Sequence, residues 1–185
     1  MTALIEASRA ADFPASIALV VANKSDAGGL EIASRAGVAA ETVESRAYSS
    51  RETFEAALQE RLTAHRIEVV CLAGFMRILS PSFVARWRGR MINIHPSLLP
   101  ELRGLDTHAR ALAAGLKEHG CTVHFVEPEL DAGPIIAQAR VPVLPGDTAD
   151  ALAARVLAEE HRLYPEALSR VARDLVRERA SDAAS

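Results

Sequence analysis

The sequence predicts an α/β fold in which helices flank a doubly wound, mostly parallel sheet. The runs 17–22 and 67–72 are short and almost wholly apolar, which is typical of strands buried on both faces of a sheet. Between them lies the segment 50–65, where apolar residues recur every four positions from Phe54 to Leu62, as on one face of a helix. Because parallel strands are joined by crossover helices, this alternation indicates the α/β class.

Length and composition are those of one globular domain. The chain has 185 residues, 49% of them hydrophobic and 24% charged, which is enough to bury a core without disulfides or metals. We expect one domain over 1–178 and a frayed tail over 179–185. Both cysteines lie in apolar runs that favour reduced, buried thiols, and no run reaches membrane-spanning length. A cytoplasmic protein without a membrane partner is therefore expected.

Charge and histidine spacing exclude two further classes of partner. The formal net charge is -3, which gives no general attraction for phosphate backbones, so we expect no nucleic-acid partner. An anionic ligand must instead be held by a local cluster of Arg or Lys. The six histidines and two cysteines show no metal-ligand spacing, so no metal is expected.

The first half of the chain predicts helices before and after its first strand. Small and apolar residues at helical spacing indicate a helix over 1–11. The strand 17–22 is followed by a helix over 28–36, which ends at Gly37.

An unusual connection follows the strand 67–72. Gly74 permits a tight turn, and apolar residues flank the single cation Arg77 before Ser80 and Pro81 start another helix. One interpretation is a buried loop with a surface arginine. The other is an apolar slot with one cation, suited to a flat ring system that bears a carboxylate. In that case we expect a ligand or an acidic partner for Arg77, because an unpaired guanidinium is costly in apolar surroundings.

The segment Met91–Pro100 is the centre of the predicted site. With the two-residue period of a strand, Asn93 and His95 share one face. Pro96 ends the strand and holds the preceding residue extended, so the imidazole of His95 projects from the carboxyl end. Ligands bind at that edge of open α/β sheets. The alternative interpretation is a polar strand end with a hydrogen-bonded histidine.

The next predicted elements support this edge. Asp106 or Thr107 can cap a helix that runs through Ala114. The strand 121–126 then presents polar side chains to one side, among them His124, which is either structural or a support for the site.

An acidic loop, 127–134, precedes the strand 135–143. Most of its acids are expected to be solvated, but Asp131 precedes Ala-Gly-Pro, a rigid turn that can direct a short carboxylate toward the sheet edge. A helix capped at Thr148 is predicted to end at Arg162, and Tyr164-Pro165 should separate it from a last helix.

Four motifs stand in order along the second half of the chain. They read Asn93-Ile-His95-Pro96-Ser-Leu-Leu-Pro100, Gly104-Leu-Asp-Thr107-His108-Ala-Arg-Ala-Leu112, His119-Gly120-Cys-Thr122-Val-His124-Phe-Val and Leu130-Asp131-Ala-Gly133-Pro134-Ile-Ile. Together they resemble the folate-dependent formyltransferases. Within that family, the Thr107-His108 pair, the Val-His124-Phe segment and residues 73–77 are similar to the members that formylate phosphoribosylglycinamide in purine synthesis. The resemblance covers essentially the whole chain.

The resemblance implies an enzyme that transfers a formyl group from its cosubstrate 10-formyltetrahydrofolate to the glycinamide amine of a ribose phosphate. It also implies that small molecules are the partners of a monomer or weak homodimer. When an amine attacks a formyl carbon, the resulting oxyanion needs a hydrogen-bond donor, and protons need a route. Asn93 and His95 can donate, and a carboxylate at Asp131 favours the charged imidazole. These three are the catalytic residues that the resemblance implies.

Similarity also implies two binding segments. The folate site is expected to be lined by Arg51, Met76, Arg77, Ile78, Leu79, Asn93, Glu127, Pro128, Glu129, Leu130 and Asp131. The glycinamide nucleotide is expected to meet Leu157, Ala158, Glu159 and Glu160, with the last of these facing its amine.

The start of the chain departs from the family pattern. Family members open with an apolar strand and a glycine-rich turn before the first helix, whereas Met1 already belongs to that helix. We therefore expect an amino-terminally truncated domain that lacks the amides for the substrate phosphate and a central strand of the sheet. Two other interpretations stay open: a formyltetrahydrofolate deformylase, and a folate-binding relative without turnover.

Overall fold

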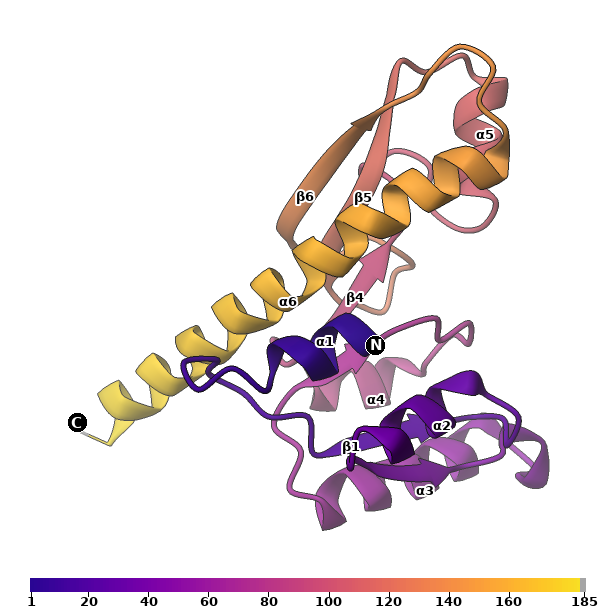
Figure 1. Ribbon diagram of the computed structural model, residues 1–185. Helices are drawn as coiled ribbons and strands as arrows, with labels where there is room; N and C mark the ends of the chain where they lie inside the picture. The colour runs from indigo at the N-terminus through magenta and orange to yellow at the C-terminus, as the bar shows by residue number, and fades with distance from the viewer. Residues whose placement is uncertain (184–185) are drawn as a thin grey trace.

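The computed structural model describes residues 1–183 and has the predicted α/β class, with helices flanking strands (Figure 1). The elements in order are α1 (Thr2–Ala7), β1 (Leu19–Ala22), α2 (Gly28–Arg35), β2 (Ala39–Thr42), the 3-10 turn Ser45–Ala47, α3 (Arg51–Ala64), β3 (Val70–Leu72), α4 (Pro81–Arg86), β4 (Met91–His95), α5 (Thr107–Ala113), β5 (Glu118–Phe125), β6 (Ile135–Pro142) and α6 (Ala149–Asp182). α1 is shorter than the helix expected over 1–11.

The strands of residues 1–183 form two separate sheets. β1 and β2 pair in parallel, and the second sheet has the order β3-β4-β5-β6. β3 and β4 are parallel, whereas β5 is antiparallel to both of its neighbours. The second half of the chain thus adds antiparallel strands: α5 lies between β4 and β5, and a loop without a helix joins β5 to β6, as antiparallel neighbours allow. β2 was not predicted, since Ala-Ala-Glu-Thr has no apolar alternation.

The longest helix, α6, is continuous, so the predicted break at Tyr164-Pro165 is wrong. A proline inside a helix costs about 3 kcal/mol, since it removes a hydrogen bond and crowds the preceding turn. Here buried residues continue on both sides of Pro165, including Val156 and Leu168, and they pack into one core. This burial outweighs the local cost. α6 extends to Asp182, past the expected domain end at 178, while 184–185 lie outside the described residues.

α6 also fixes the strand that carries the predicted site. The hydroxyl of buried Tyr164 lies 2.8 Å from the carbonyl oxygen of Leu72 and 3.1 Å from that of Ile92. It therefore links α6 to β3 and β4 at once. Although α6 is long, neither it nor another helix within 1–183 combines the length and hydropathy needed to cross a membrane.

A histidine pair joins α5 to β5. Nδ1 of His108 lies 3.1 Å from Nε2 of His119, and the two ring planes are nearly perpendicular. Burial, together with the nearby His108, lowers the pKa of His119 to about 4. Burial likewise lowers the pKa of His108. Both imidazoles are thus neutral at pH 7, and folding opposes their protonation.

This pair should make stability fall as the pH falls. The pKa of His119 is about 4 in the folded chain against 6.5 ordinarily, so the unfolded chain binds more protons between these values. The free energy of unfolding should therefore decrease from about pH 6.5 toward pH 4, with a slope of at most about 1.4 kcal/mol per pH unit for one proton. Urea unfolding of the wild type and of His119→Gln at pH 7 and pH 5 measures the effect.

We expect His119→Gln to lose less stability than the wild type between these two pH values. The matched control is His161→Gln, because His161 is exposed on α6. Its loss of stability between pH 7 and pH 5 should equal that of the wild type. Equal losses in the wild type and in His119→Gln would refute this account of the pair.

Candidate functional site

The site is built at the carboxyl end of β4. This strand lies between β3 and β5, where Asn93 is in register with Leu72 on one side and His124 on the other. Its first residues, Met91 and Ile92, are fully buried, so the strand is held firmly up to the point where the polar residues begin. β4 ends with His95, which precedes the proline as expected.

Two threonine hydroxyls fix the loop that follows β4. Thr107 donates to the carbonyl oxygen of Pro96 at 2.6 Å, and Thr122 donates to that of Ser97 at 2.7 Å. Asp106 precedes α5 but makes no capping hydrogen bond through its side chain, so the predicted cap is wrong. Its backbone is left-handed, with φ of 56°. The loop is thus held by two buried hydroxyls, a role that the sequence patterns did not predict for either threonine.

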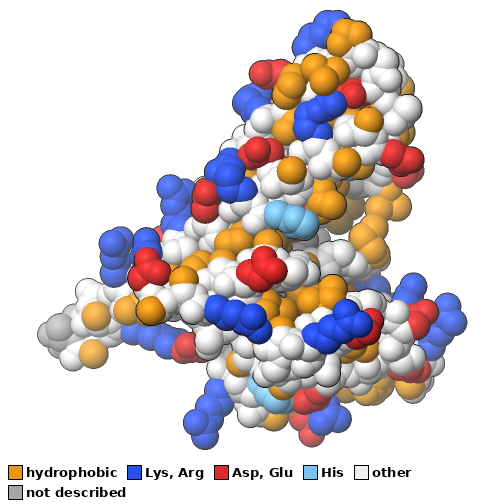
Figure 2. Space-filling view, in the orientation of Figure 1, with side chains coloured by type: hydrophobic (Ala, Val, Ile, Leu, Met, Phe, Trp, Pro, Cys, Tyr) orange, Lys and Arg blue, Asp and Glu red, His pale blue; other side chains and the backbone are white. Residues whose placement is uncertain are grey.

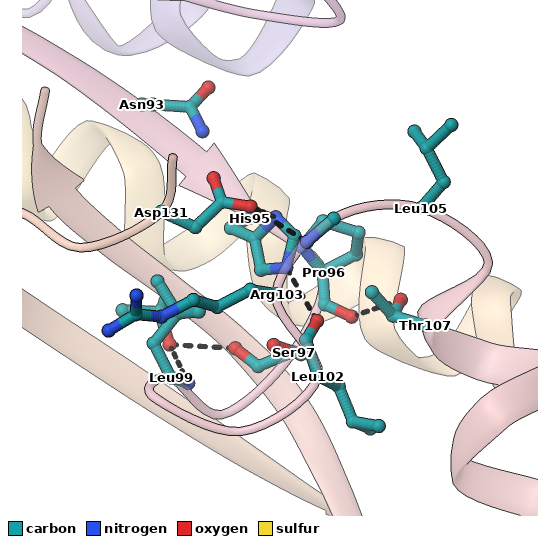
Figure 3. A network of polar contacts seen from close by, with 12 residues as sticks. Asn93, His95, Pro96, Ser97, Leu99, Leu102, Arg103, Leu105, Thr107 and Asp131 are labelled. Atoms are coloured by element: carbon teal, nitrogen blue, oxygen red, sulfur yellow. Dashed lines mark hydrogen bonds and ion pairs between the residues drawn. The ribbon is translucent and has the colours of Figure 1, made fainter. Parts of the chain in front are cut away.

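Asp131 reaches this edge from the loop between β5 and β6 (Figure 3). Its backbone is left-handed, with φ of 50°, and its side chain is only 7% exposed. Oδ2 accepts a hydrogen bond from the amide of Gly104 at 2.9 Å and lies 3.5 Å from Nδ1 of His95. Oδ1 lies 3.8 Å from Nε2 of His124. One carboxylate therefore links three segments of the chain.

The turn after Asp131 requires glycine at one position. A Cβ atom on Gly133 would lie 1.8 Å from the carbonyl oxygen of Phe125, which no side chain permits. The amide of Phe125 also donates to the carbonyl oxygen of Pro134 at 2.9 Å. These contacts hold the loop against the end of β5 and thereby set the position of the carboxylate.

The imidazole of His95 is held from both sides. Nε2 lies 3.0 Å from the carbonyl oxygen of Leu102, which can only accept, so this nitrogen carries a hydrogen. Nδ1 faces the carboxylate of Asp131, and a hydrogen there gives a favourable contact that a bare lone pair does not. The ring is 6% exposed. Both of its nitrogens are therefore occupied in this structure.

His124 supports Asn93 through one defined tautomer. Nδ1 of His124 donates to the carbonyl oxygen of Phe125 at 2.8 Å, so Nε2 has a free lone pair. That lone pair lies 3.3 Å from Nδ2 of Asn93 and accepts one of its two hydrogens. Burial lowers the pKa of His124 and keeps it neutral. Within residues 1–183, the second amide hydrogen of Asn93 has no partner.

The predicted folate segment after β3 has both exposed and buried members. Met76 is 73% exposed and Ile78 is 67% exposed, whereas Leu79 is buried with Phe83 in the smaller core cluster. The side chain of Leu79 is therefore directed into the core.

The expected acidic partner of Arg77 is not found among residues 1–183. Instead, Nη1 of Arg77 lies 3.3 Å from the hydroxyl oxygen of Ser45, and the guanidinium lies 5.4 Å from the centre of the Phe54 ring. The aromatic contact and solvent exposure together remove the need for a carboxylate. Arg51, at the start of α3, is also exposed and lies 4.0 Å from Glu52.

The acids of the loop after β5 have different partners. Glu127 lies 4.0 Å from Arg88, and Glu129 lies 2.6 Å from Arg103. Pro128 and Leu130 are exposed beside them. Asp131 is thus the acid of this loop that faces His95.

The predicted nucleotide segment lies on α6. Leu157 and Ala158 are exposed, and Glu159 forms an ion pair with Arg162 at 2.8 Å. Glu160 is partly buried, and this burial raises the pKa of its carboxyl group. It lines a cavity between β1 and β3. Within the described part of the chain, no three His, Cys, Asp or Glu side chains are arranged to hold a metal ion.

Known proteins resemble this chain in sequence and in structure. A family model described as Formyl transferase matches residues 1–168. Phosphoribosylglycinamide formyltransferase of Escherichia coli (strain K12) is 48% identical over 169 residues, which cover 91% of this chain and 80% of that protein. The trifunctional purine biosynthetic protein adenosine-3 of Homo sapiens is 46% identical over 172 residues, which cover 93% of this chain and 17% of that much longer protein.

Solved structures of similar proteins also match this chain. The phosphoribosylglycinamide formyltransferase from Brucella melitensis matches with a TM-score of 0.90 and 53% identity, covering 93% of this chain and 88% of that one. Glycinamide ribonucleotide transformylase 1 from Symbiobacterium toebii matches with a TM-score of 0.91 and 48% identity, covering 94% and 82%. By sequence and by structure, this chain belongs to the formyl transferase family.

Proposed function

We propose that this protein transfers the formyl group of 10-formyltetrahydrofolate to the amine of 5-phosphoribosylglycinamide. The observation that carries the proposal is the convergence of Asn93, His95 and Asp131 at the end of β4, in a chain 48% identical to the Escherichia coli enzyme of that name. The reaction takes place between two small molecules and needs no metal, because the developing charge can be met by hydrogen-bond donors.

Asn93 and His95 are the two hydrogen-bond donors of the proposed reaction, and they have different roles. The substrate amine forms a bond to the formyl carbon, whose oxygen becomes an oxyanion, and the bond from that carbon to N10 of the folate then breaks. The free amide hydrogen of Asn93 can donate to the oxyanion. His95 can donate from Nε2 once the carbonyl oxygen of Leu102 has given way to substrate. The proton released by the amine passes to the leaving N10, with the imidazole of His95 as the nearest carrier.

Asp131 and Glu160 have different tasks in this scheme. Asp131 does not touch the reacting atoms: it orients the imidazole through Nδ1 and compensates positive charge on the ring. Glu160 offers a partly buried carboxyl group on α6 that can accept a hydrogen bond from the glycinamide amine. Leu157, Ala158 and Glu159 lie beside it and complete the proposed nucleotide segment.

The first test removes the donor and its partner. His95→Ala should lower kcat by about 10²–10³, since one oxyanion donor is lost, while the Kd for folate changes little. Asp131→Asn should also lower kcat, because the amide no longer compensates the charged imidazole. The measurement is single-turnover formyl transfer with each variant. The control is His161→Ala, which lies exposed on α6 and should retain wild-type turnover.

The same assay without the glycinamide nucleotide separates the alternatives. Formyl loss that depends on the nucleotide supports the transferase. Equal loss without it indicates a deformylase, and folate binding without any loss indicates an inactive relative. Wild-type turnover in His95→Ala would remove this residue from the mechanism.

The second test concerns the folate segment. We expect Met76→Asp and Ile78→Asp to weaken folate binding by about 10-fold or more, because a charge replaces apolar contact worth about 1.5–3 kcal/mol. Both side chains are exposed, so the chain should still fold. Val176→Asp, at an exposed apolar position near the end of α6, is the matched control and should bind folate normally. Unchanged Kd values in both test variants would place the pterin elsewhere.

A further inference from the structure

A buried glutamate, Glu55, binds the end of the segment that carries the proposed folate side chains. Glu55 lies on α3 and is only 5% exposed, and its partner Ser80 is 4% exposed. Oε1 of Glu55 accepts a hydrogen bond from the amide of Ser80 at 2.6 Å, and Oε2 accepts one from the hydroxyl of the same serine. One carboxylate therefore holds both the backbone and the side chain of this residue.

Ser80 joins the segment 74–79 to α4, which its hydroxyl caps. Among residues 1–183, no hydrogen bond between backbone groups holds residues 74–79. The segment is held instead by side chains, because Leu79 packs in the smaller core cluster and the guanidinium of Arg77 lies over the ring of Phe54. The contact of Ser80 with the carboxylate is thus the directional hydrogen bonding that fixes this end of the segment.

The segment presents two exposed apolar side chains, Met76 and Ile78, on either side of Arg77. Exposure alone does not mark a binding surface, since Val176 on α6 is 59% exposed. Figure 2 likewise shows hydrophobic side chains gathered between the part of the molecule that holds α1 and α6 and the part that holds α2 and β1. A segment without backbone hydrogen bonds binds a ligand tightly only if it is ordered beforehand, because ordering it on binding costs affinity.

We propose that Glu55 is a positioning residue for the folate segment, which it fixes by holding Ser80. This inference rests on the proposed function, since it takes 10-formyltetrahydrofolate as the ligand of Met76 and Ile78. Glu55 itself touches no substrate. A buried carboxylate is costly without partners, so the carboxylate and the serine hold each other in one place. Replacing Glu55 therefore loosens the segment without removing an atom that contacts folate.

The same two helices offer a matched control. Nε1 of Trp87, at the other end of α4, donates to Oε1 of Gln59 at 2.9 Å, and Gln59 lies one turn after Glu55 on α3. Loss of this hydrogen bond weakens the packing of α3 on α4 but leaves Ser80 in place. If Glu55 served stability alone, changes at Glu55 and at Gln59 would have the same effect on folate binding.

The test compares Glu55→Leu with Gln59→Leu in the full 1–185 chain. Each substitution removes the acceptor oxygens of one α3 side chain and keeps a side chain of similar size. Glu55→Gln retains one acceptor oxygen, and it tests the proposal even if Glu55→Leu does not fold. Calorimetry gives the Kd for 10-formyltetrahydrofolate, urea unfolding gives stability, and formyl transfer at saturating folate gives kcat.

We expect Glu55→Leu to raise the Kd for folate by about tenfold or more, because two hydrogen bonds to a carboxylate are lost. Glu55→Gln should raise it by about threefold, since one acceptor remains. In both variants kcat at saturating folate should stay within about twofold of the wild type, because the residues at the end of β4 are unchanged. Gln59→Leu should lower stability but bind folate as the wild type does.

An unchanged Kd in both Glu55 variants, or an equal increase in Gln59→Leu, would overturn the positioning role and leave the proposed reaction intact. A fall in kcat without a change in Kd would overturn this role as well. The expected pattern of Kd values without transfer to the glycinamide nucleotide would support the positioning role and contradict the proposed reaction. A wild-type protein that does not bind 10-formyltetrahydrofolate would overturn both.

Discussion

The site depends on one buried carboxylate, that of Asp131. It lies in a left-handed turn, accepts a hydrogen bond from Gly104 and faces the imidazole of His95 at 3.5 Å. A buried charge of this kind is costly unless it is paired, so the groups around it are constrained together. The end of β4, the loop before α5 and the loop before β6 are thereby held at one point.

The scaffold makes this pairing possible by fixing β4. Pairing with β3 and β5 and the hydroxyl of Tyr164 hold its backbone, so the imidazole of His95 and the amide of Asn93 leave the strand end from fixed positions. Rigid donors are what an oxyanion requires, because they need no reorganisation as the charge develops. The contact between His95 and the carbonyl oxygen of Leu102 differs in kind, since a loop residue supplies it and, in the proposed mechanism, substrate replaces it.

Sequence patterns predicted the parts of the structure that follow from local chemistry. The apolar runs, Pro96 after His95 and the turn formers after Asp131 indicated the strands and the polar edge. They did not reveal β2, whose residues have no apolar alternation, or the continuity of α6 through Pro165, which depends on tertiary burial. The acidic partner expected for Arg77 is replaced by the ring of Phe54, a contact between distant segments that no local rule identifies.

The main-chain groups that hydrogen-bond to the site side chains could not be predicted from local sequence patterns either. The amide of Gly104 and the carbonyl oxygens of Leu102 and Phe125 decide which nitrogens of the two site histidines carry hydrogen. Every residue has such groups, so their role appears only when the fold brings them to a side chain. The family resemblance predicted which side chains form the site, and the structure adds the main-chain groups that hydrogen-bond to them.

The carboxylate of Asp131 faces Nδ1 of His95 and orients its ring, while His124 stays neutral beside them. Long-range ¹H–¹⁵N spectra of the imidazole nitrogens, recorded at pH 7 for the wild type and for Asp131→Asn, test it most directly. We predict that the Nδ1 signal of His95 moves between the wild type and Asp131→Asn, because the carboxylate 3.5 Å away is lost, and that His124 has the Nδ1–H tautomer in both. Identical His95 signals in the two proteins, or an Nε2–H tautomer on His124, would contradict the account.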